Sequence, residues 1–195
     1  MPSSASRARV ATELDLDACA KLQTSCFYDP VFGHGKMWTV FDDVLYHAFA
    51  KDVRATLGQK YEPHAKLGRF ASLVVDASDE IVAVAEVSIQ RSSECARAIE
   101  RLTGVRRESR EYCYLSCMCV DERFRGRGLA SRLVAAGERV ARDWGFDVLT
   151  LHVYIENIRA LNVYERAGFV AIDFPARTPY DVVRGRSKAF MAKRL

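Results

Sequence analysis

The sequence lacks the features that mark several large classes of protein. No apolar run approaches the roughly 20 residues that a membrane-spanning helix needs, so we expect no membrane partner. Only four histidines are present, and the six cysteines contain no C-x-x-C pair, so we expect no metal site. There is also no internal repeat and no low-complexity linker. These absences favour a single folded domain.

The charge balance is only mildly basic. The 29 Lys and Arg residues outnumber the 25 Asp and Glu residues, for a formal net charge of +4. This charge suits an anionic ligand but falls short of the basic footprint of a nucleic-acid binder, so we expect no nucleic-acid partner. The 195 residues suffice for one well-buried core. We predict one domain over residues 10–195, after a flexible tail over 1–9 that is a targeting remnant or a frayed end.

Three cysteines lie close together in one apolar stretch. Cys113, Cys117 and Cys119 are separated by even numbers of residues, so we predict that they are small core residues on one face of a strand. The cysteine spacing as a whole favours a reducing compartment.

The periodicity of apolar residues divides the chain into helices and strands. Helices are expected at 15–27, 41–57, 129–144 and 158–167. Strands are expected at 10–13, 69–75, 81–89, 112–120, 148–155, 170–174 and 188–194. The polar stretch 90–111 holds six arginines, and a helix in its middle is one alternative.

One strand-helix-strand unit sets the topology. Strand 112–120, helix 129–144 and strand 148–155 require a right-handed crossover between parallel strands. The neighbouring hairpins are antiparallel. We therefore predict an α/β fold with a mixed, mostly antiparallel sheet around this parallel core.

A basic loop with two glycines lies between that strand and helix. Gly126 and Gly128 allow backbone N–H groups to approach a ligand, and the following helix adds its unpaired N–H groups and positive dipole end. A dinucleotide-binding fingerprint would need Gly or Ala at Ser131, and a Walker loop would need Gly-Lys-Ser/Thr, so both are excluded. The loop alone is either a pyrophosphate site or a basic turn.

Two motifs in the right order resemble the acetyl-CoA-binding core of the GNAT superfamily. The first is Arg-x-x-Gly-x-Gly at 123–128, and the second is Asn157 followed by Tyr164 and the pair Gly168-Phe169. The resemblance implies the GNAT acyl-CoA N-acyltransferase fold and an enzyme that moves acetyl from acetyl-CoA to an amine. The stretches 84–88, 114–118, 144–147, 151–154 and 191–195 resemble plastid-type GNAT enzymes of plants and algae. That closer resemblance implies the plastid stroma, and the cytoplasm is the alternative.

The resemblance also implies which residues hold acetyl-CoA. Tyr164 resembles the family's general acid, which protonates the departing CoA sulfur, and Asn157 is expected beside the pantetheine arm. The arm is expected to pair with the end of the strand at 112–120, and the pyrophosphate with the glycine loop. The expected cofactor-binding residues are Met118, Cys119, Val120, Arg123, Arg125, Gly126, Arg127, Gly128, Leu129, Ala130, Asn157 and Tyr164.

Three residues are candidates for the general base, and each can instead be a core residue. In protein N-terminal acetyltransferases of the family, a tyrosine and a histidine on neighbouring strands cooperate, and Tyr112 and His152 occupy matching positions here. A shift of the alignment by two residues would replace Tyr112 with Tyr114. Glu86 is the third candidate, either at the edge of the site or as a paired structural acid.

The acceptor site is expected near an aromatic turn. Phe27, Tyr28 and Phe32, together with Glu86, are the expected substrate-binding residues, although the aromatic side chains can also pack between two helices. The resemblance favours protein N-terminal α-amines, and also lysine ε-amines, as acceptors. The alternatives are a small-amine acetyltransferase of the arylalkylamine or serotonin type and a CoA-binding module without catalysis. The sequence does not predict an oligomeric state.

Overall fold

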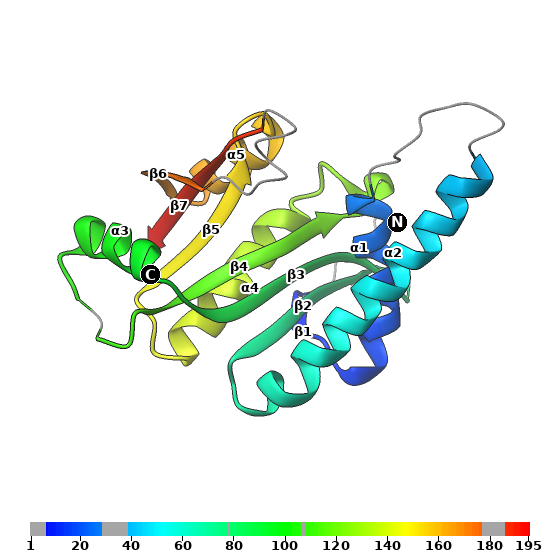
Figure 1. Cartoon of the computed structure of the whole chain (residues 1–195), viewed down its shortest axis with the longest axis horizontal. Helices are drawn as coiled ribbons and strands as arrows, with labels where there is room; N and C mark the ends of the chain where they lie inside the picture. The colour runs from blue at the N-terminus through cyan, green and yellow to red at the C-terminus, as the bar shows by residue number, and fades with distance from the viewer. Residues whose placement is uncertain (1–6, 29–38, 78, 107, 177–185) are drawn as a thin grey trace.

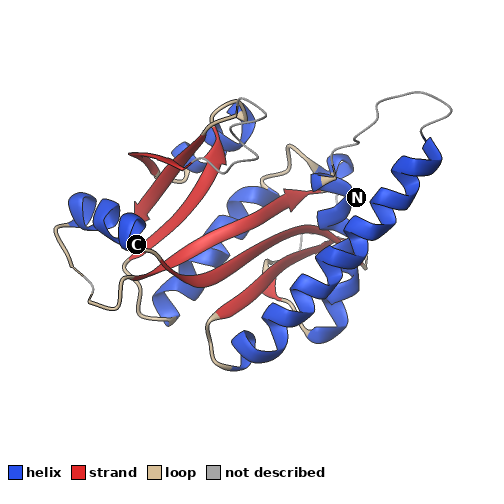
Figure 2. Ribbon diagram, viewed as in Figure 1, coloured by secondary structure: helices blue, strands red, loops and turns tan. Residues whose placement is uncertain are grey.

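The structure, a computed structural model, describes residues 7–28, 39–77, 79–106, 108–176 and 186–195. Within these residues one seven-stranded sheet has the order β1-β2-β3-β4-β5-β7-β6, with helices on both of its faces (Figures 1 and 2). The neighbours β4 and β5 are parallel, and the other neighbouring strands are antiparallel. The predicted mixed sheet with a parallel core is confirmed.

The elements follow the predicted order closely. The strands are β1 (Arg9–Val10), β2 (Phe70–Ala77), β3 (Glu80–Arg91), β4 (Glu111–Val120), β5 (Val148–Tyr154), β6 (Val170–Ala176) and β7 (Lys188–Arg194). The α-helices are α1 (Leu16–Phe27), α2 (Thr39–Lys60), α3 (Ser93–Thr103), α4 (Leu129–Asp143) and α5 (Ile158–Arg166). Short helical turns are η1 (Glu13–Asp15), η2 (Tyr61–Ala65) and η3 (Glu122–Phe124). The helix that was one alternative within 90–111 is present as α3.

The start of the described chain differs from the predicted tail over 1–9. Arg9 opens β1, and its guanidinium pairs with Asp15 at 2.7 Å and with Asp76 at 2.8 Å. The pair with Asp76 fastens β1 to β2, and the pair with Asp15 fastens β1 to η1. Residues 1–6 of the predicted tail lie outside the described residues.

Side chains alternate across the sheet and build a core on each face. On one face, the apolar stripe of α4 packs with Val87 and Leu115. On the other face, Leu22 of α1 and Leu57 of α2 pack with Val84. Full burial of an aliphatic side chain of this size contributes about 1.5–3 kcal/mol, so both helical layers stabilise the sheet. None of the described helices has the length and hydropathy of a membrane span.

A β-bulge in β4 changes the face on which its side chains lie. The pairing with β3 slips by one residue opposite the Val84–Glu86 step, and Cys117 has a left-handed φ of 49°. Cys113, before the bulge, is buried in the core under α4, whereas Cys119, after it, is buried in the core under α1 and α2. The prediction that these cysteines share one face is wrong, because an inserted residue reverses the alternation.

Candidate active site

The strands β4 and β5 separate soon after they begin. Their pairing is limited to Cys113 with Leu149 and Tyr114 with Thr150, and the two strands then diverge (Figure 1). Beyond these pairs, this side of β4 has no paired neighbour among the described residues. The exposed peptide groups of such an edge can pair with an extended ligand arm. Met118, Cys119 and Val120, the predicted pantetheine-binding residues, lie on this separated end of β4.

The glycine loop has the geometry of an anion cradle. Gly126 and Gly128 have left-handed φ values of 76° and 74°, and apart from the glycine itself and its two chain neighbours no described atom lies within 4 Å of the position that a Cβ would take at either residue. Leu129 and Ala130 form the first turn of α4, and Gly128 caps that helix without a side chain. The first N–H groups of α4 are therefore left for a ligand, as an anion site requires.

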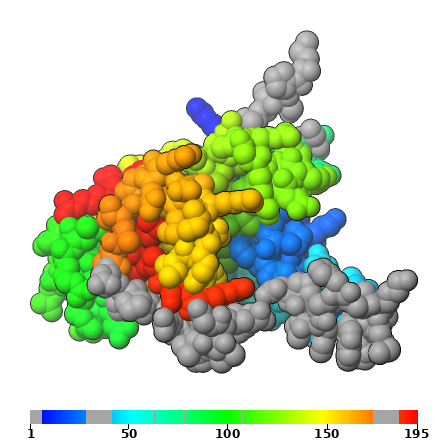
Figure 3. Space-filling model, turned by 90° about the horizontal axis from the view of Figure 1, so that it is seen from above, coloured from blue at the N-terminus to red at the C-terminus, as the bar shows by residue number. Residues whose placement is uncertain are grey.

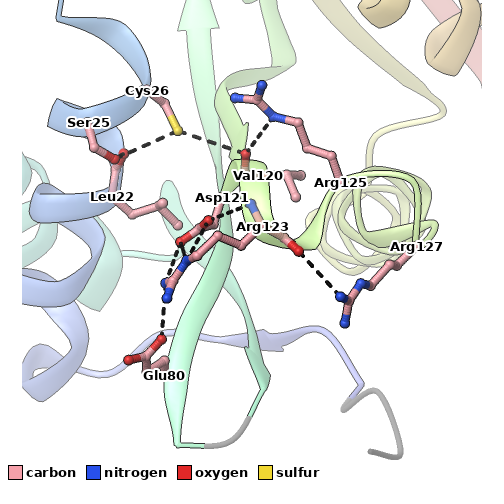
Figure 4. A network of polar contacts seen from close by, with 9 residues as sticks. All are labelled: Leu22, Ser25, Cys26, Glu80, Val120, Asp121, Arg123, Arg125 and Arg127. Atoms are coloured by element: carbon pink, nitrogen blue, oxygen red, sulfur yellow. Dashed lines mark hydrogen bonds and ion pairs between the residues drawn. The ribbon is translucent and has the colours of Figure 1, made fainter. Parts of the chain in front are cut away.

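The three arginines of the loop have different environments (Figure 4). The guanidinium of Arg123 lies 2.8 Å from Asp121 and 3.2 Å from Glu80, so it ties the loop to β3. This pairing lowers the pKa of the Asp121 carboxyl. Nε of Arg125 donates to the Val120 carbonyl at 3.2 Å, and Nη2 of Arg127 donates to the Arg123 carbonyl at 3.3 Å. The exposed Arg125 and Arg127 are thus the better placed to face a phosphate.

The helix α5 carries Tyr164 and is capped by Asn157, and Tyr164 lies in the same core cluster as Leu129 at the end of the loop. Asn157 caps α5 by accepting a hydrogen bond from the Ala160 N–H at 3.1 Å. The ring of Tyr164 is 7% exposed and packs edge-on against Phe169, with ring centroids 5.8 Å apart. Burial raises the pKa of Tyr164, with a further contribution from Tyr114, so its phenol keeps its proton at neutral pH. Seen from above, α5 (yellow and orange) lies beside the loop (light green) (Figure 3).

A tyrosine and a histidine meet across the separation of β4 and β5. The hydroxyl of Tyr114 lies 3.1 Å from Nδ1 of His152. The imidazole stacks on Phe190 at a centroid distance of 4.7 Å. Burial, followed by the charge of Lys188, lowers the pKa of His152 to about 4, so the ring is neutral at physiological pH. Its Nε2 is buried and has no hydrogen-bond partner among the described residues.

Tyr112 lies two residues before Tyr114 on β4. The hydroxyl that lies beside His152 belongs to Tyr114 and not to Tyr112. The ring of Tyr112 contacts Tyr114 edge-on at 6.3 Å and Phe190 at 6.4 Å. Burial, and then a hydrogen bond with Cys95 of α3, raises the pKa of Tyr112. Of the two tyrosines that the alignment left open, Tyr114 is therefore the one that the fold brings to His152.

Glu86 is held by two polar partners beneath α1 and α2. Its side chain is only 2% exposed, and its two oxygens accept hydrogen bonds from Gln23 and Lys60, each at 2.8 Å. This arrangement matches the alternative of a paired structural acid. The sequence analysis predicted neither partner. Gln23 could have indicated a buried polar contact, because it is a polar residue within the apolar stripe of α1.

The predicted acceptor residues are only partly described. The hydroxyl of Tyr28 donates to the Asp42 carbonyl at 3.0 Å, and its ring packs edge-on against Tyr46 at 5.3 Å. Tyr28 thus joins α1 to α2. Phe27 is 47% exposed, and Phe32 lies outside the described residues.

The depressed pKa of His152 predicts a pH-dependent stability. Because the folded value of about 4 lies below the unfolded value near 6.5, the folded state binds fewer protons between these two pKa values. The stability that this neutral ring contributes is complete above about pH 6.5 and is lost as the pH falls through 4. We expect His152→Gln to flatten the decline in unfolding free energy between these limits, as measured by urea denaturation of both proteins. If the unfolding free energies of the two proteins decline in parallel as the pH falls, the decline does not come from the titration of His152.

Comparisons with known proteins agree with this geometry. Residues 21–169 match the acetyltransferase (GNAT) family. The chain is 26% identical over 181 residues to GCN5-related N-acetyltransferase 10, chloroplastic, of Arabidopsis thaliana, which covers 89% of this chain and 65% of that protein. The chain therefore spans slightly less than two thirds of this relative.

Solved structures share the fold at low sequence identity. A ribosomal-protein-alanine N-acetyltransferase from Brucella melitensis has a TM-score of 0.64 and 19% identity, over 96% of this chain and 99% of that one. The PaiA N-acetyltransferase from Thermoplasma acidophilum, in complex with coenzyme A, has a TM-score of 0.61 and 11% identity, over 96% of this chain and 98% of that one. Because the family match spans β4, the glycine loop, α4, β5 and α5, this chain belongs to the acetyltransferase (GNAT) family.

Proposed function

We propose that the chain transfers acetyl from acetyl-CoA to the α-amine of protein N-termini, and also to lysine ε-amines. The observation that carries this proposal is the Tyr114–His152 pair, held at 3.1 Å where β4 and β5 separate. The same separation opens toward the glycine loop and α5. One site thus combines a proton acceptor, an edge for the pantetheine arm and a cradle for the pyrophosphate.

The bound acetyl-CoA would supply the thioester as acetyl donor. Gly126, Gly128 and the first turn of α4 would hold the pyrophosphate, and the backbone of 118–120 would hold the pantetheine arm. A neutral His152 accepts the Tyr114 proton at Nδ1 while the Tyr114 oxygen takes the proton of the attacking amine. Since the nitrogen becomes acidic once it bonds to the carbonyl carbon, a weak base is sufficient for this transfer. Tyr164, buried and protonated, gives its proton to the leaving thiolate.

Protonation favours an α-amine as the acceptor. At pH 7 a protein α-amine is roughly 10–15% neutral, whereas a free lysine is only about 0.04% neutral. A neutral imidazole with a low pKa cannot remove the first proton of an ammonium group efficiently, so the neutral fraction of the acceptor matters. The Brucella neighbour is named a ribosomal-protein-alanine N-acetyltransferase, and this name is consistent with the preference because alanine has no side-chain amine. The chloroplastic name of the Arabidopsis relative supports a plastid location.

Mass spectrometry of host proteins tests the acceptor class. The chain is expressed in a bacterium, and acetylation of α-amines and lysines is compared with an empty vector and with Tyr164→Phe expressed to the same level. We expect new N-terminal acetylation, with fewer lysine sites, that the variant lacks. Acetylation of serotonin by the purified protein without any new protein acetylation would instead establish the small-amine alternative. Coenzyme A binding with no acetylation of either kind would indicate a module without catalysis.

A further inference from the structure

Two cysteines on different elements meet beside the separated end of β4. Cys26 lies in the last turn of α1 and packs against the core cluster that contains Cys119 of β4. The Sγ of Cys26 lies 4.0 Å from the Val120 carbonyl, the residue directly after Cys119 (Figure 4). The Cys119 side chain is also the largest cause that lowers the pKa of Cys26. The two cysteines therefore lie in one packed cluster, although they are 93 positions apart in the chain.

The two thiols differ in exposure and in electrostatics. Cys26 is half-buried, and the hydrogen bonds from Cys119 and Ser25, together with the charge of Arg125, lower its pKa. Cys119 is 6% exposed, and its contact with Cys26 and its burial raise its pKa. Cys26 thus has the character of an attacking thiolate, and Cys119 that of a resolving thiol that keeps its proton.

We propose that Cys26 and Cys119 form a redox-modification site, at which a hydroperoxide closes a disulfide and a dithiol reductant opens it. The Cys26 thiolate attacks one peroxide oxygen and becomes a sulfenic acid, while the other oxygen leaves as hydroxide and takes up a proton. The Cys119 sulfur then attacks the Cys26 sulfur, and its proton leaves with the sulfenic oxygen as water. Each sulfur loses one electron to the peroxide, so hydrogen peroxide yields one disulfide and two molecules of water.

Closing this disulfide would alter the edge of β4. The two sulfurs must approach to about 2 Å, which would move α1 and β4 relative to each other. The carbonyl of Val120 would lose its contact with the Cys26 thiol, and this same carbonyl accepts a hydrogen bond from Arg125 of the glycine loop. This consequence rests on the proposed function: oxidation should weaken acetyl-CoA binding by about tenfold, or 1.4 kcal/mol.

Peptide mapping tests the disulfide without reference to activity. The full chain is treated with hydrogen peroxide, its free thiols are alkylated, and it is digested with trypsin. We expect a link between peptides 22–36 and 111–123 that dithiothreitol removes. Because 111–123 holds three cysteines, Cys119→Ser should abolish the link, whereas Cys113→Ser and Cys117→Ser should retain it. A link that survives in Cys119→Ser, or oxidation of Cys26 to a sulfinic acid with no link, would overturn the proposal.

Calorimetry with acetyl-CoA tests the consequence separately. We expect the Kd to rise about tenfold on oxidation of the natural chain and to stay unchanged on oxidation of Cys26→Ser. A disulfide that forms with no change in Kd would contradict the control of binding, while leaving the modification site in place. If the reduced chain binds no acetyl-CoA at all, the proposed function fails, and the peptide map still decides the fate of the cysteine pair.

Discussion

Replacing Gly126 with valine should raise the Kd for acetyl-CoA by at least about tenfold, with a loss in kcat/KM of the same size. Gly126 has a φ of 76°, a conformation that costs a β-branched residue about 1–3 kcal/mol. The space around the position of a Cβ at this residue is open, so the new side chain would begin in free space. We expect the valine side chain to extend into the space that we assign to the pyrophosphate. Calorimetry with acetyl-CoA measures the effect directly.

Gly145→Val is the matched control for this experiment. Gly145 follows the other end of α4, has a φ of 75° and also has open space around the position of a Cβ. Both variants should therefore lose similar stability, because both place a branched side chain in the left-handed region. Only Gly126→Val should lose acetyl-CoA affinity. Equal affinities in the two variants would show that the loop at 123–128 is not the pyrophosphate site.

The shape of the glycine loop could be predicted from the sequence because it depends on backbone geometry. Two glycines at fixed spacing before an amphipathic helix determine both the left-handed φ values and the free N–H groups. The crossover from 112 to 155 could also be predicted. A strand, a long helix and a second strand join parallel neighbours almost always through a right-handed connection. The sheet and the loop therefore followed from local patterns.

The partners of the polar side chains could not be predicted in this way. The bulge at Cys117 adds one residue to β4, and a single inserted residue leaves no mark in an apolar sequence. The choice between Tyr112 and Tyr114 depended on where β5 begins to diverge, a property of the sheet as a whole. Lys60 reaches Glu86 from the far end of α2, over a separation of 26 positions. Contacts of this kind are set by packing.

Tyr164→Phe should lower kcat by about 10²-fold while the KM for acetyl-CoA changes little, because a positioned general acid contributes 10²- to 10⁴-fold. The ring of Tyr164 is 7% exposed and packs against Phe169, so phenylalanine should keep that packing. What the variant loses is a proton that burial keeps on the oxygen well above neutral pH. Steady-state kinetics with acetyl-CoA and a peptide bearing a free N-terminus measures both parameters.

Tyr61→Phe controls for the removal of a phenolic hydroxyl elsewhere in the fold. Tyr61 donates to the Ala11 carbonyl at 3.4 Å and packs against the core under α1 and α2. The Tyr61→Phe variant should keep the kcat of the natural chain.

If Tyr164→Phe also keeps this kcat, Tyr164 is a packing residue and the thiolate must leave without its help. If kcat falls and the acetyl-CoA KM rises equally, Tyr164 acts in binding. A fall in kcat alone, absent in Tyr61→Phe, is the result that a general acid requires, because the proton is needed only as the C–S bond breaks.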